Sequence, residues 1–567
     1  MKIKKILITT VLTCLCTVSS AFVTVGSTVD CDYDNLLDAY NDTDAFVRVT
    51  TEVTHSDSFT ISKSQWFTGG YSTCAFAVAD IQGGAYSKWT HSGFGTVISI
   101  NAANAIVTLD QFEIFGGNDV SSSGAGGIKV VGNAALLLAN SLVHDNAGNE
   151  GGGIRLWGPD ARVTITDSRI YNNTSSAAGA GVYCENGARF TMLADSAIKT
   201  NIATGKGGGI YANSDCQVNV LSGTADNSML LEIGIIGNQA SQGGGVYITN
   251  GADMTLTGND EHPASIVANI SNVNSFVGGG GVYVNGVGSS FTGTNAKIDF
   301  NQAQDLAAGI VVFNSAEFSM TRLDTTCWDN DKCSSFSNNS VNTASGDSGG
   351  GYIGNDSTVE IFKTYIANNR ADGTVLFTLY INASLKLEGN LIVDNTSFAQ
   401  NSAAQLFNIA GPSGSPASLN FFYNTIASNN TLSHFRLNSS TPQTLRIYNS
   451  IIRDQGDIIN TSAGVNHTLI INCNYLHETS SLGFAQSEAD NFNANPGFVD
   501  AANGDYHVVA GSLSKDLCSN DFTQSIYDLN GNLRGDDDPS VPNLNGPYDA
   551  GAYEYTENDT VFKNGFE

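Results

Sequence analysis

A short sequence unit recurs along most of this 567-residue chain. It opens with clustered glycines and an aliphatic residue, continues with an alternating stretch and closes with asparagine, as in GGGIRLW and RVTITDSRIYNN over 151–173. Successive copies lie 26 to 38 residues apart. The closing asparagines are Asn146, Asn173, Asn201, Asn238, Asn269, Asn301, Asn339, Asn369, Asn395 and Asn429. Self-similarity sustained at such a period is typical of a solenoid.

The alternating stretches predict β-strands. Val163–Ile165 and Phe190–Met192 alternate apolar and polar residues, and helical periodicity is absent. One unit cannot bury its apolar face alone, whereas units stacked strand over strand at about 4.8 Å bury a continuous core. We therefore predict an all-β chain coiled as a parallel β-helix of about 13 rungs, roughly 60 Å long. The phased asparagines are expected to form a ladder of stacked amides, and the glycines to occupy turns.

The paired motifs GG[GA][ILV] and [FI]xxN resemble the repeats of polymorphic outer membrane proteins. These proteins lie within the pectin-lyase-like class of right-handed parallel β-helices. The resemblance covers roughly residues 120–455. It implies a right-handed coil and leaves the activity open, because one fold hosts many functions.

The beginning of the chain has the pattern of a secretory signal over residues 1–21. Three lysines precede an apolar run from Ile6 to Cys16, and we expect cleavage after Ala21. No later stretch approaches the roughly 18 apolar residues of a membrane-spanning helix. We therefore expect an exported protein, extracellular or on the outer cell surface, with no integral membrane span.

Beyond the signal, the pattern divides the chain into four parts. We expect an N-terminal cap with the first coils over 22–96, the β-helix over 97–480, a small C-terminal module over 481–556 and a tail over 557–567. Within the module, Asn495–Ser512 and Asp549–Tyr555 resemble the choice-of-anchor Q domain, which follows β-helices in many bacterial surface proteins. Leu513 departs from that family, which usually has proline at this position. The resemblance implies a role in anchoring.

Eight cysteines remain after cleavage of the signal, an even number that favours disulfides in an oxidising compartment. Their proximity in sequence suggests four pairs. These pairs are Cys31–Cys74, Cys184–Cys216, Cys327–Cys333 and Cys473–Cys518. Their spacing does not resemble a zinc site, so we predict no metal site there.

The charge balance argues against one class of partner. Without the signal the chain carries 22 basic and 54 acidic residues. Nucleic-acid binding depends on neutralising phosphates with lysine and arginine, so we do not expect it. The acidity favours a protein that stays in solution and is monomeric.

A pattern of tyrosines provides the candidate binding site. The aliphatic residue that opens each unit is expected to point inward, and the residue after it then points outward. The outward residues would form a surface stripe that ends near Trp157 and could bind a glycan or another surface polymer. They are Arg155, Tyr183, Tyr211, Tyr247 and Tyr283. Stacked tyrosines also stabilise a solenoid by themselves, so a structural role is the alternative.

Enzymatic motifs are weak in this chain. The Asn-Thr-Asp and Gly-His-Gly tripeptides of polygalacturonases do not occur. A calcium-dependent lyase needs clustered carboxylates and a basic residue, but Asp145, Glu150, Arg155 and Asp167 form no phased set. The stretch Asp528–Arg534 loosely resembles a calcium loop, and we expect a turn there instead. We predict no catalytic residues, cofactor or metal.

These observations favour a non-catalytic secreted or cell-surface protein for adhesion or for binding a polysaccharide or another surface polymer. Two alternatives remain open. One is a polysaccharide lyase or glycoside hydrolase of the pectin-lyase-like class, and the other is a purely architectural surface rod.

Overall fold

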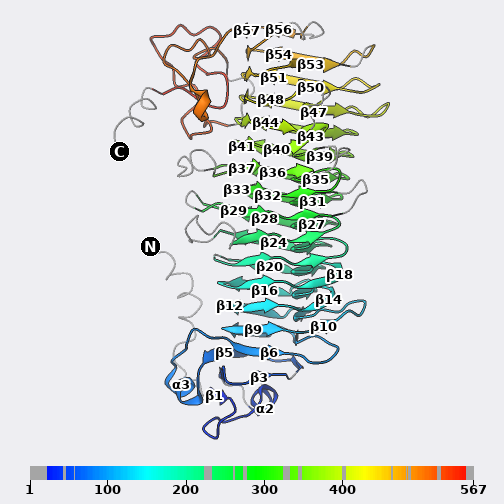
Figure 1. Ribbon diagram of the computed structural model, residues 1–567, viewed down its shortest axis with the longest axis vertical. Helices are drawn as coiled ribbons and strands as arrows, with labels where there is room; N and C mark the ends of the chain where they lie inside the picture. The colour runs from blue at the N-terminus through cyan, green and yellow to red at the C-terminus, as the bar shows by residue number, and fades with distance from the viewer. Residues whose placement is uncertain are drawn as a thin grey trace.

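In the part of the chain that it describes, the computed structural model forms one elongated stack of coils, with helices only near its two ends (Figure 1). It describes residues 22–42, 46–56, 58–193, 195–222, 233–259, 262–272, 278–323, 333–341, 348–398, 404–461, 464–479, 482, 487–519 and 525–556. The expected signal over 1–21 and the tail over 557–567 lie outside these residues. Within them, no helix is long and apolar enough to cross a membrane.

Four parallel sheets form the stack, three of them along nearly its whole length and the fourth along its middle part. In the described residues they contain 17, 16, 14 and 10 strands, and we call them sheets A, B, C and D. Sheet A runs from β1 (Phe22–Val25) to β56 (Ser487–Ala489), and sheet B from β3 (Thr54–His55) to β57 (Phe492–Asn493). Sheet C runs from β4 (Phe59–Ile61) to β53 (Asp457–Thr461), and sheet D from β10 (Asn118–Asp119) to β46 (Thr396–Ser397).

Each coil adds one strand to three or four sheets, which is the predicted parallel β-helix. One such coil consists of β15 (Ile154–Trp157) in sheet C, β16 (Arg162–Thr166) in sheet A, β17 (Arg169–Tyr171) in sheet B and β18 (Thr174–Ala178) in sheet D. The stack is longer than our estimate of about 13 rungs, because more coils precede Asn146 and follow Asn429 than the estimate allowed, and sheet A alone has 17 strands.

Alternation along the strands places one apolar row from each sheet inside the coil. In β16, Val163 and Ile165 point into the coil and are 1% and 0% exposed. Thr164 and Thr166 alternate with them, point outward and are half-buried. The aliphatic residues that open the repeats, such as Ile154 and Val182, are fully buried. They form one continuous core through the whole stack, so burial by neighbouring coils stabilises each coil.

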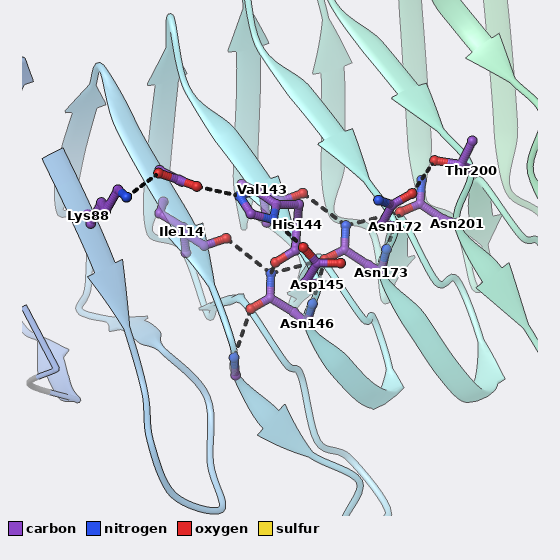
Figure 2. A network of polar contacts seen from close by, with 12 residues as sticks. Lys88, Ile114, Val143, His144, Asp145, Asn146, Asn172, Asn173, Thr200 and Asn201 are labelled. Atoms are coloured by element: carbon purple, nitrogen blue, oxygen red, sulfur yellow. Dashed lines mark hydrogen bonds and ion pairs between the residues drawn. The ribbon is translucent and has the colours of Figure 1, made fainter. Parts of the chain in front are cut away.

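The predicted asparagine ladder is present (Figure 2). Asn173 donates from its side-chain nitrogen to Asn201 Oδ1 at 3.0 Å, and the same oxygen accepts the backbone N–H of Asn173, also at 3.0 Å. Asn146 makes the same pair of contacts with Asn173. The ladder continues to Asn429, where the carboxylate of Asp454 accepts the last two hydrogen bonds.

A second polar ladder, which the repeat pattern did not reveal, lies between sheets A and B. The backbone N–H of Thr364 donates to Asn390, and Asn390 donates to Asn424 at 2.9 Å from both its backbone and its side chain. Earlier coils have serine at this position. For example, the backbone N–H of Ser141 donates to the hydroxyl oxygen of Ser168 at 3.0 Å. Both ladders satisfy buried backbone groups at corners of the coil.

Three disulfides lie within the described residues, and they confirm three of the predicted pairs: Cys31–Cys74, Cys184–Cys216 and Cys473–Cys518. Cys327, half of the fourth predicted pair, lies outside the described residues. The first disulfide joins the N-terminal cap with helix α2 (Leu36–Asp42) to the start of helix α3 (Cys74–Ala79). Disulfides indicate an oxidising compartment.

The C-terminal segment, described over residues 495–519 and 525–556, packs along the outside of the last coils (orange in Figure 1). It contains the antiparallel pair β58 (Phe498–Asp500) and β59 (Asp505–Val508), joined by the short helix η3 (Ala501–Asn503). Hydrogen bonds join it to the coils, including Tyr423 Oη to the Ser519 carbonyl at 2.9 Å. The segment therefore covers part of the outer face of the β-helix.

Candidate functional site

Four of the predicted site residues form a stack of aromatic rings on the outer side of sheet C. The strands β19 (Val182–Glu185), β23 (Ile210–Ala212), β27 (Val246–Thr249) and β31 (Val282–Asn285) lie in register, so their tyrosines are direct neighbours. The ring centroids of Tyr183, Tyr211, Tyr247 and Tyr283 are 5.0, 5.6 and 4.8 Å apart in that order, and the rings are stacked.

The stack is not the exposed stripe that alternation predicted. Tyr183, Tyr247 and Tyr283 are only 6%, 3% and 7% exposed, and Tyr211 is half-buried. A glycine of positive φ precedes each strand and brings the turn close to the base of the tyrosine side chain. At Gly179, where φ is 63°, a Cβ atom would lie 2.8 Å from Tyr183 Cβ. The rings cover one another, and Leu306, Ala307 and Val311 pack with Tyr247 and Tyr283.

Burial also governs the ionisation of these tyrosines. It raises the pKa of Tyr211 and of Tyr283 to about 12, and it raises the pKa of Tyr183 and Tyr247 further. The hydroxyls therefore stay neutral. The burial and stacking support a structural role for Tyr211, Tyr247 and Tyr283.

Arg155 closes the N-terminal end of the stack and is itself only 5% exposed. Its Nη2 donates to Glu185 Oε1 at 2.7 Å and lies 3.0 Å from Glu150 Oε2. Its guanidinium carbon lies 5.6 Å from the ring centroid of Tyr183, and Tyr183 Oη donates to Glu185 Oε2 at 3.2 Å. One cation thus holds two carboxylates from neighbouring coils in fixed positions.

Trp157 is the most exposed of the predicted site residues. It lies two positions after Arg155 on β15, so both side chains leave the same face of the strand. Its register partner on β19 is Glu185, and its side chain is 44% exposed, whereas Trp89 is fully buried. We call Glu150, Arg155, Trp157 and Glu185 the Trp157 patch.

The two carboxylates of the patch have different surroundings. Burial raises the pKa of Glu150, against the opposing effect of Arg155. The side chains of Glu150 and Glu185 are 24% and 14% exposed, so both are accessible in part. Beside an exposed indole, they can accept hydrogen bonds from a polar ligand.

A polar network on sheet B, which the sequence did not suggest, surrounds His144 (Figure 2). His144 Nε2 lies 3.1 Å from Glu113 Oε1, and His144 Nδ1 lies 2.7 Å from Asp145 Oδ2. The imidazole is stacked between Phe115 and Tyr171, with centroid distances of 5.5 and 4.7 Å. Both ring nitrogens face carboxylates, so neither is free to act on a substrate.

One signal for this network is present in the sequence. His144 and Tyr171 each lie two positions before a closing asparagine, so they share one phase of the repeat. Residues in one phase lie over one another in neighbouring coils, which explains the stacking of these rings.

The stretch that loosely resembles a calcium loop forms a turn. Asp528 accepts hydrogen bonds from the backbone N–H of Asn532 at 2.7 Å and from that of Glu554 at 2.8 Å. Its carboxylate oxygens therefore bind backbone groups of the protein. Among the residues that the structure describes, no group of three or more histidines, cysteines and carboxylates is placed to hold a metal ion.

Comparison with known proteins supports the fold. The family model described as "Right handed beta helix region" matches residues 95–261, which include the Trp157 patch and the first three stacked tyrosines. No curated protein and no solved structure matches the chain. The matched family defines an architecture, so the function has to be argued from the site.

Proposed function

We propose that this chain is a non-catalytic, extracellular β-helix protein that binds a polysaccharide or another surface polymer, with adhesion as its role. The observation that carries the proposal is the exposed Trp157 side chain, whose register partner Glu185 is held in place by Arg155. The chain is proposed to act as a monomer, with no nucleic acid, cofactor or metal.

The geometry of the patch suits a ring-shaped polar ligand. An indole offers a large apolar face, and exposing it to water is unfavourable unless a partner covers it. The apolar face of a sugar ring can pack on Trp157 while its hydroxyls donate to Glu150 or Glu185. Because β15 and β19 are both held in the stack, the patch is ordered before the ligand arrives, which lowers the entropic cost of binding.

Resemblances in the sequence support the extracellular setting. The repeats resemble those of polymorphic outer membrane proteins, and the C-terminal segment resembles a choice-of-anchor Q module. The signal pattern and the three disulfides agree with export to an oxidising compartment. We therefore place the protein outside the cell, with its C-terminal segment in an anchoring role.

Retention on immobilised polysaccharides tests this function. The Trp157→Ala variant should lose retention on the polymer that holds the wild type, with an unchanged circular dichroism spectrum. Leu221→Ala is the matched control, because Leu221 is 40% exposed and lies on β24 (Gln217–Leu221) of sheet A, whereas the patch lies on sheets C and D. Equal retention of the wild type and Trp157→Ala would refute the proposed site.

One observation favours a second candidate, a polysaccharide hydrolase or lyase. Glu150 and Glu185 contact the same guanidinium nitrogen, and burial raises the pKa of Glu150. Paired carboxylates in unequal surroundings are what a glycoside hydrolase uses as acid and nucleophile. Release of reducing or unsaturated ends from polysaccharides, and its loss in Glu150→Gln, would support this enzyme over a binding protein.

A further inference from the structure

A second group of aromatic side chains lies on the outer face of sheet C, beyond the tyrosine stack. Its three members, Phe313, Tyr352 and Tyr380, are all half-buried. The ring centroids of Phe313 and Tyr352 are 6.3 Å apart, and those of Tyr352 and Tyr380 are 6.4 Å apart. They come from the register-paired strands of three successive coils: β35 (Ile310–Phe313), β39 (Gly351–Gly354) and β43 (Thr374–Tyr380). We call these three residues the aromatic platform.

Gly354, the last residue of β39, leaves room for two of the rings. A Cβ atom at this position would lie 2.8 Å from Phe313 Cε2 and 3.1 Å from Tyr352 Cε1. Contacts this short would force the rings to move, so the missing side chain lets the Phe313 ring extend over the neighbouring strand. Gly354 is therefore a positioning residue for the platform.

The strands around the platform are uncharged, although the whole chain has a formal net charge of −29. None of the described strands of sheet C from β23 to β47 (Gln405–Ala410) contains a charged residue. Charges lie instead in the turns beside the three platform strands, and all are aspartates among the described residues there: Asp305, Asp356 and Asp372. The platform therefore has an uncharged surface with an acidic border.

The cations of this face lie farther away along the rod axis than these aspartates do. Lys206 Nζ lies 4.8 Å from the ring centroid of Tyr247, and Arg436 is in the outward row of Tyr352. Tyr247 and Arg436 are each three coils from Tyr352, about 14 Å along the axis. An anionic polymer on the platform would meet more repulsion than ion pairing, whereas a neutral polymer would meet neither.

The platform is also aligned with Trp157. Phe313 and Trp157 are each the fourth and last residue of their strands, β35 and β15, and the strands between them are in register. They therefore share one outward row, five coils or about 24 Å apart. After Glu185, this row holds uncharged Thr249 and Asn285, and Asn285 Nδ2 lies 3.2 Å from Thr249 Oγ1. A polymer parallel to the rod axis would contact aromatic rings at both ends of the row.

We infer that the aromatic platform is a second binding site for a neutral polysaccharide, whose chain runs along the rod and also contacts Trp157. This inference rests on the proposed polymer binding, and it adds a site and a ligand class. The sugar rings pack their apolar faces on the three aromatic rings, and their hydroxyls exchange hydrogen bonds with the hydroxyls of Tyr352 and Tyr380. Two sites on one rigid rod strengthen the binding of a long chain, because the second contact is intramolecular.

Electrophoresis of the full chain in native gels that contain a dissolved polysaccharide tests this site. Mixed-linkage glucan, xylan and mannan are the neutral probes, and polygalacturonate is the anionic one. We expect at least one neutral probe to retard the wild type, and polygalacturonate to retard it less. Tyr380→Ala and Gly354→Ala should each weaken binding by roughly threefold or more, the size of one aromatic contact. Gly354→Ala keeps every aromatic residue, so its effect reports the positions of the rings.

Tyr171→Ala is the matched control, because Tyr171 is also half-buried and stacked, but on His144 of sheet B. It should leave the retardation unchanged, and all variants should keep the circular dichroism spectrum of the wild type. An equal loss in Tyr171→Ala and Tyr380→Ala would overturn the inference.

The remaining outcomes separate this site from the proposed function. Retardation that depends on Trp157 but is unchanged in both Tyr380→Ala and Gly354→Ala would overturn the inference and leave the proposed function intact. Stronger retardation by polygalacturonate than by every neutral probe would do the same. A wild type that sediments as a dimer, beside a monomeric Tyr380→Ala variant, would assign the platform to a second copy of the chain. No retardation by any polysaccharide would refute both proposals.

Discussion

Arg155 Nη2 lies 2.7 Å from Glu185 Oε1, although the two residues are 30 positions apart in the sequence. The contact exists because β15 and β19 are in register, with Arg155 beside Tyr183 and Trp157 beside Glu185. The candidate site is thus a product of coil stacking, and its geometry depends on the same register as the core. A change that shifts the register should therefore disturb the core and the site together, whereas a side-chain substitution within the site should leave the core intact.

Arg155→Leu should destabilise the protein, because it leaves two partly buried carboxylates facing each other. We expect a decrease of about 2 kcal/mol in the free energy of unfolding, less than for a fully buried pair. Chemical denaturation measures it. Arg162→Leu is the control, since Arg162 makes a longer contact of 3.5 Å with Asp160 at an exposed position. Equal stability of the two variants would show that Arg155 does not hold the patch together.

Asn201→Ala should interrupt the asparagine ladder. It leaves the backbone and side-chain donors of Asn173 without their acceptor and removes the contact with Asn238. Unpaired buried donors cost about 1–3 kcal/mol each, so we expect a loss of roughly 3 kcal/mol. Asn219→Ala, on the outer face of sheet A, should change stability by less than about 0.5 kcal/mol. If Asn201→Ala lowered the free energy of unfolding by no more than Asn219→Ala does, the result would contradict the ladder's role.

The C-terminal segment should loosen as the pH rises through neutrality. Burial raises the pKa of Asp549 to about 7, although its carboxylate accepts backbone N–H groups of Asp516 and Tyr555, and burial also raises the pKa of Glu554. The pKa of Asp549 in the folded protein is higher than its unfolded value of about 3.9. The stabilisation that the protonated Asp549 carboxyl provides is therefore complete below about pH 3.9, and it is lost as the pH rises through about 7.

For Asp549 alone, this linkage predicts a loss of about 1.4 kcal/mol between pH 6 and pH 8. Hydrogen exchange of the C-terminal segment at the two pH values measures it locally. Asp549→Asn should flatten the dependence, whereas Asp253→Asn should not. A segment that becomes more protected at the higher pH would contradict the sign.

The disulfide Cys473–Cys518 joins the C-terminal segment to the end of β54 (Thr468–Asn472) across a sequence separation of 45 residues. Replacing both cysteines by serine should lower stability by about 4 kcal/mol if constraint of the unfolded chain dominates. The effect should be local, with faster proteolysis of the segment and unchanged coils. Uniformly faster cleavage along the whole chain would show that the segment and the coils unfold together.

Much of the fold could be predicted from the sequence because each coil repeats the same phase. The ladder from Asn146 to Asn429 and the inward direction of Ile154 are confirmed, since both follow from repetition alone. The second ladder, through Asn390 and Asn424, was missed because other coils place serine there.

The candidate site was predictable only in part. Alternation gave the outward direction of Tyr247 correctly, but its burial depends on the neighbouring rings of Tyr211 and Tyr283 and on the apolar cluster that they form with it. Predicting the ion pairs of Arg155 with Glu150 and Glu185 would also have required the register of neighbouring strands, which the spacing of residues in the sequence does not fix. The packing of the C-terminal segment could not be predicted, because it joins residues far apart in the sequence and no repeated motif marks the contacts.

The most direct test of polymer binding at the Trp157 patch is the fluorescence of Trp157 during titration with a soluble oligomer of the polysaccharide that retains the wild type. The account predicts that the wild-type emission shifts to shorter wavelength as the exposed indole is covered, and that Trp157→Phe shows no such shift. A shift of the same size in Trp157→Phe, or an unchanged wild-type spectrum at saturating oligomer, would contradict it.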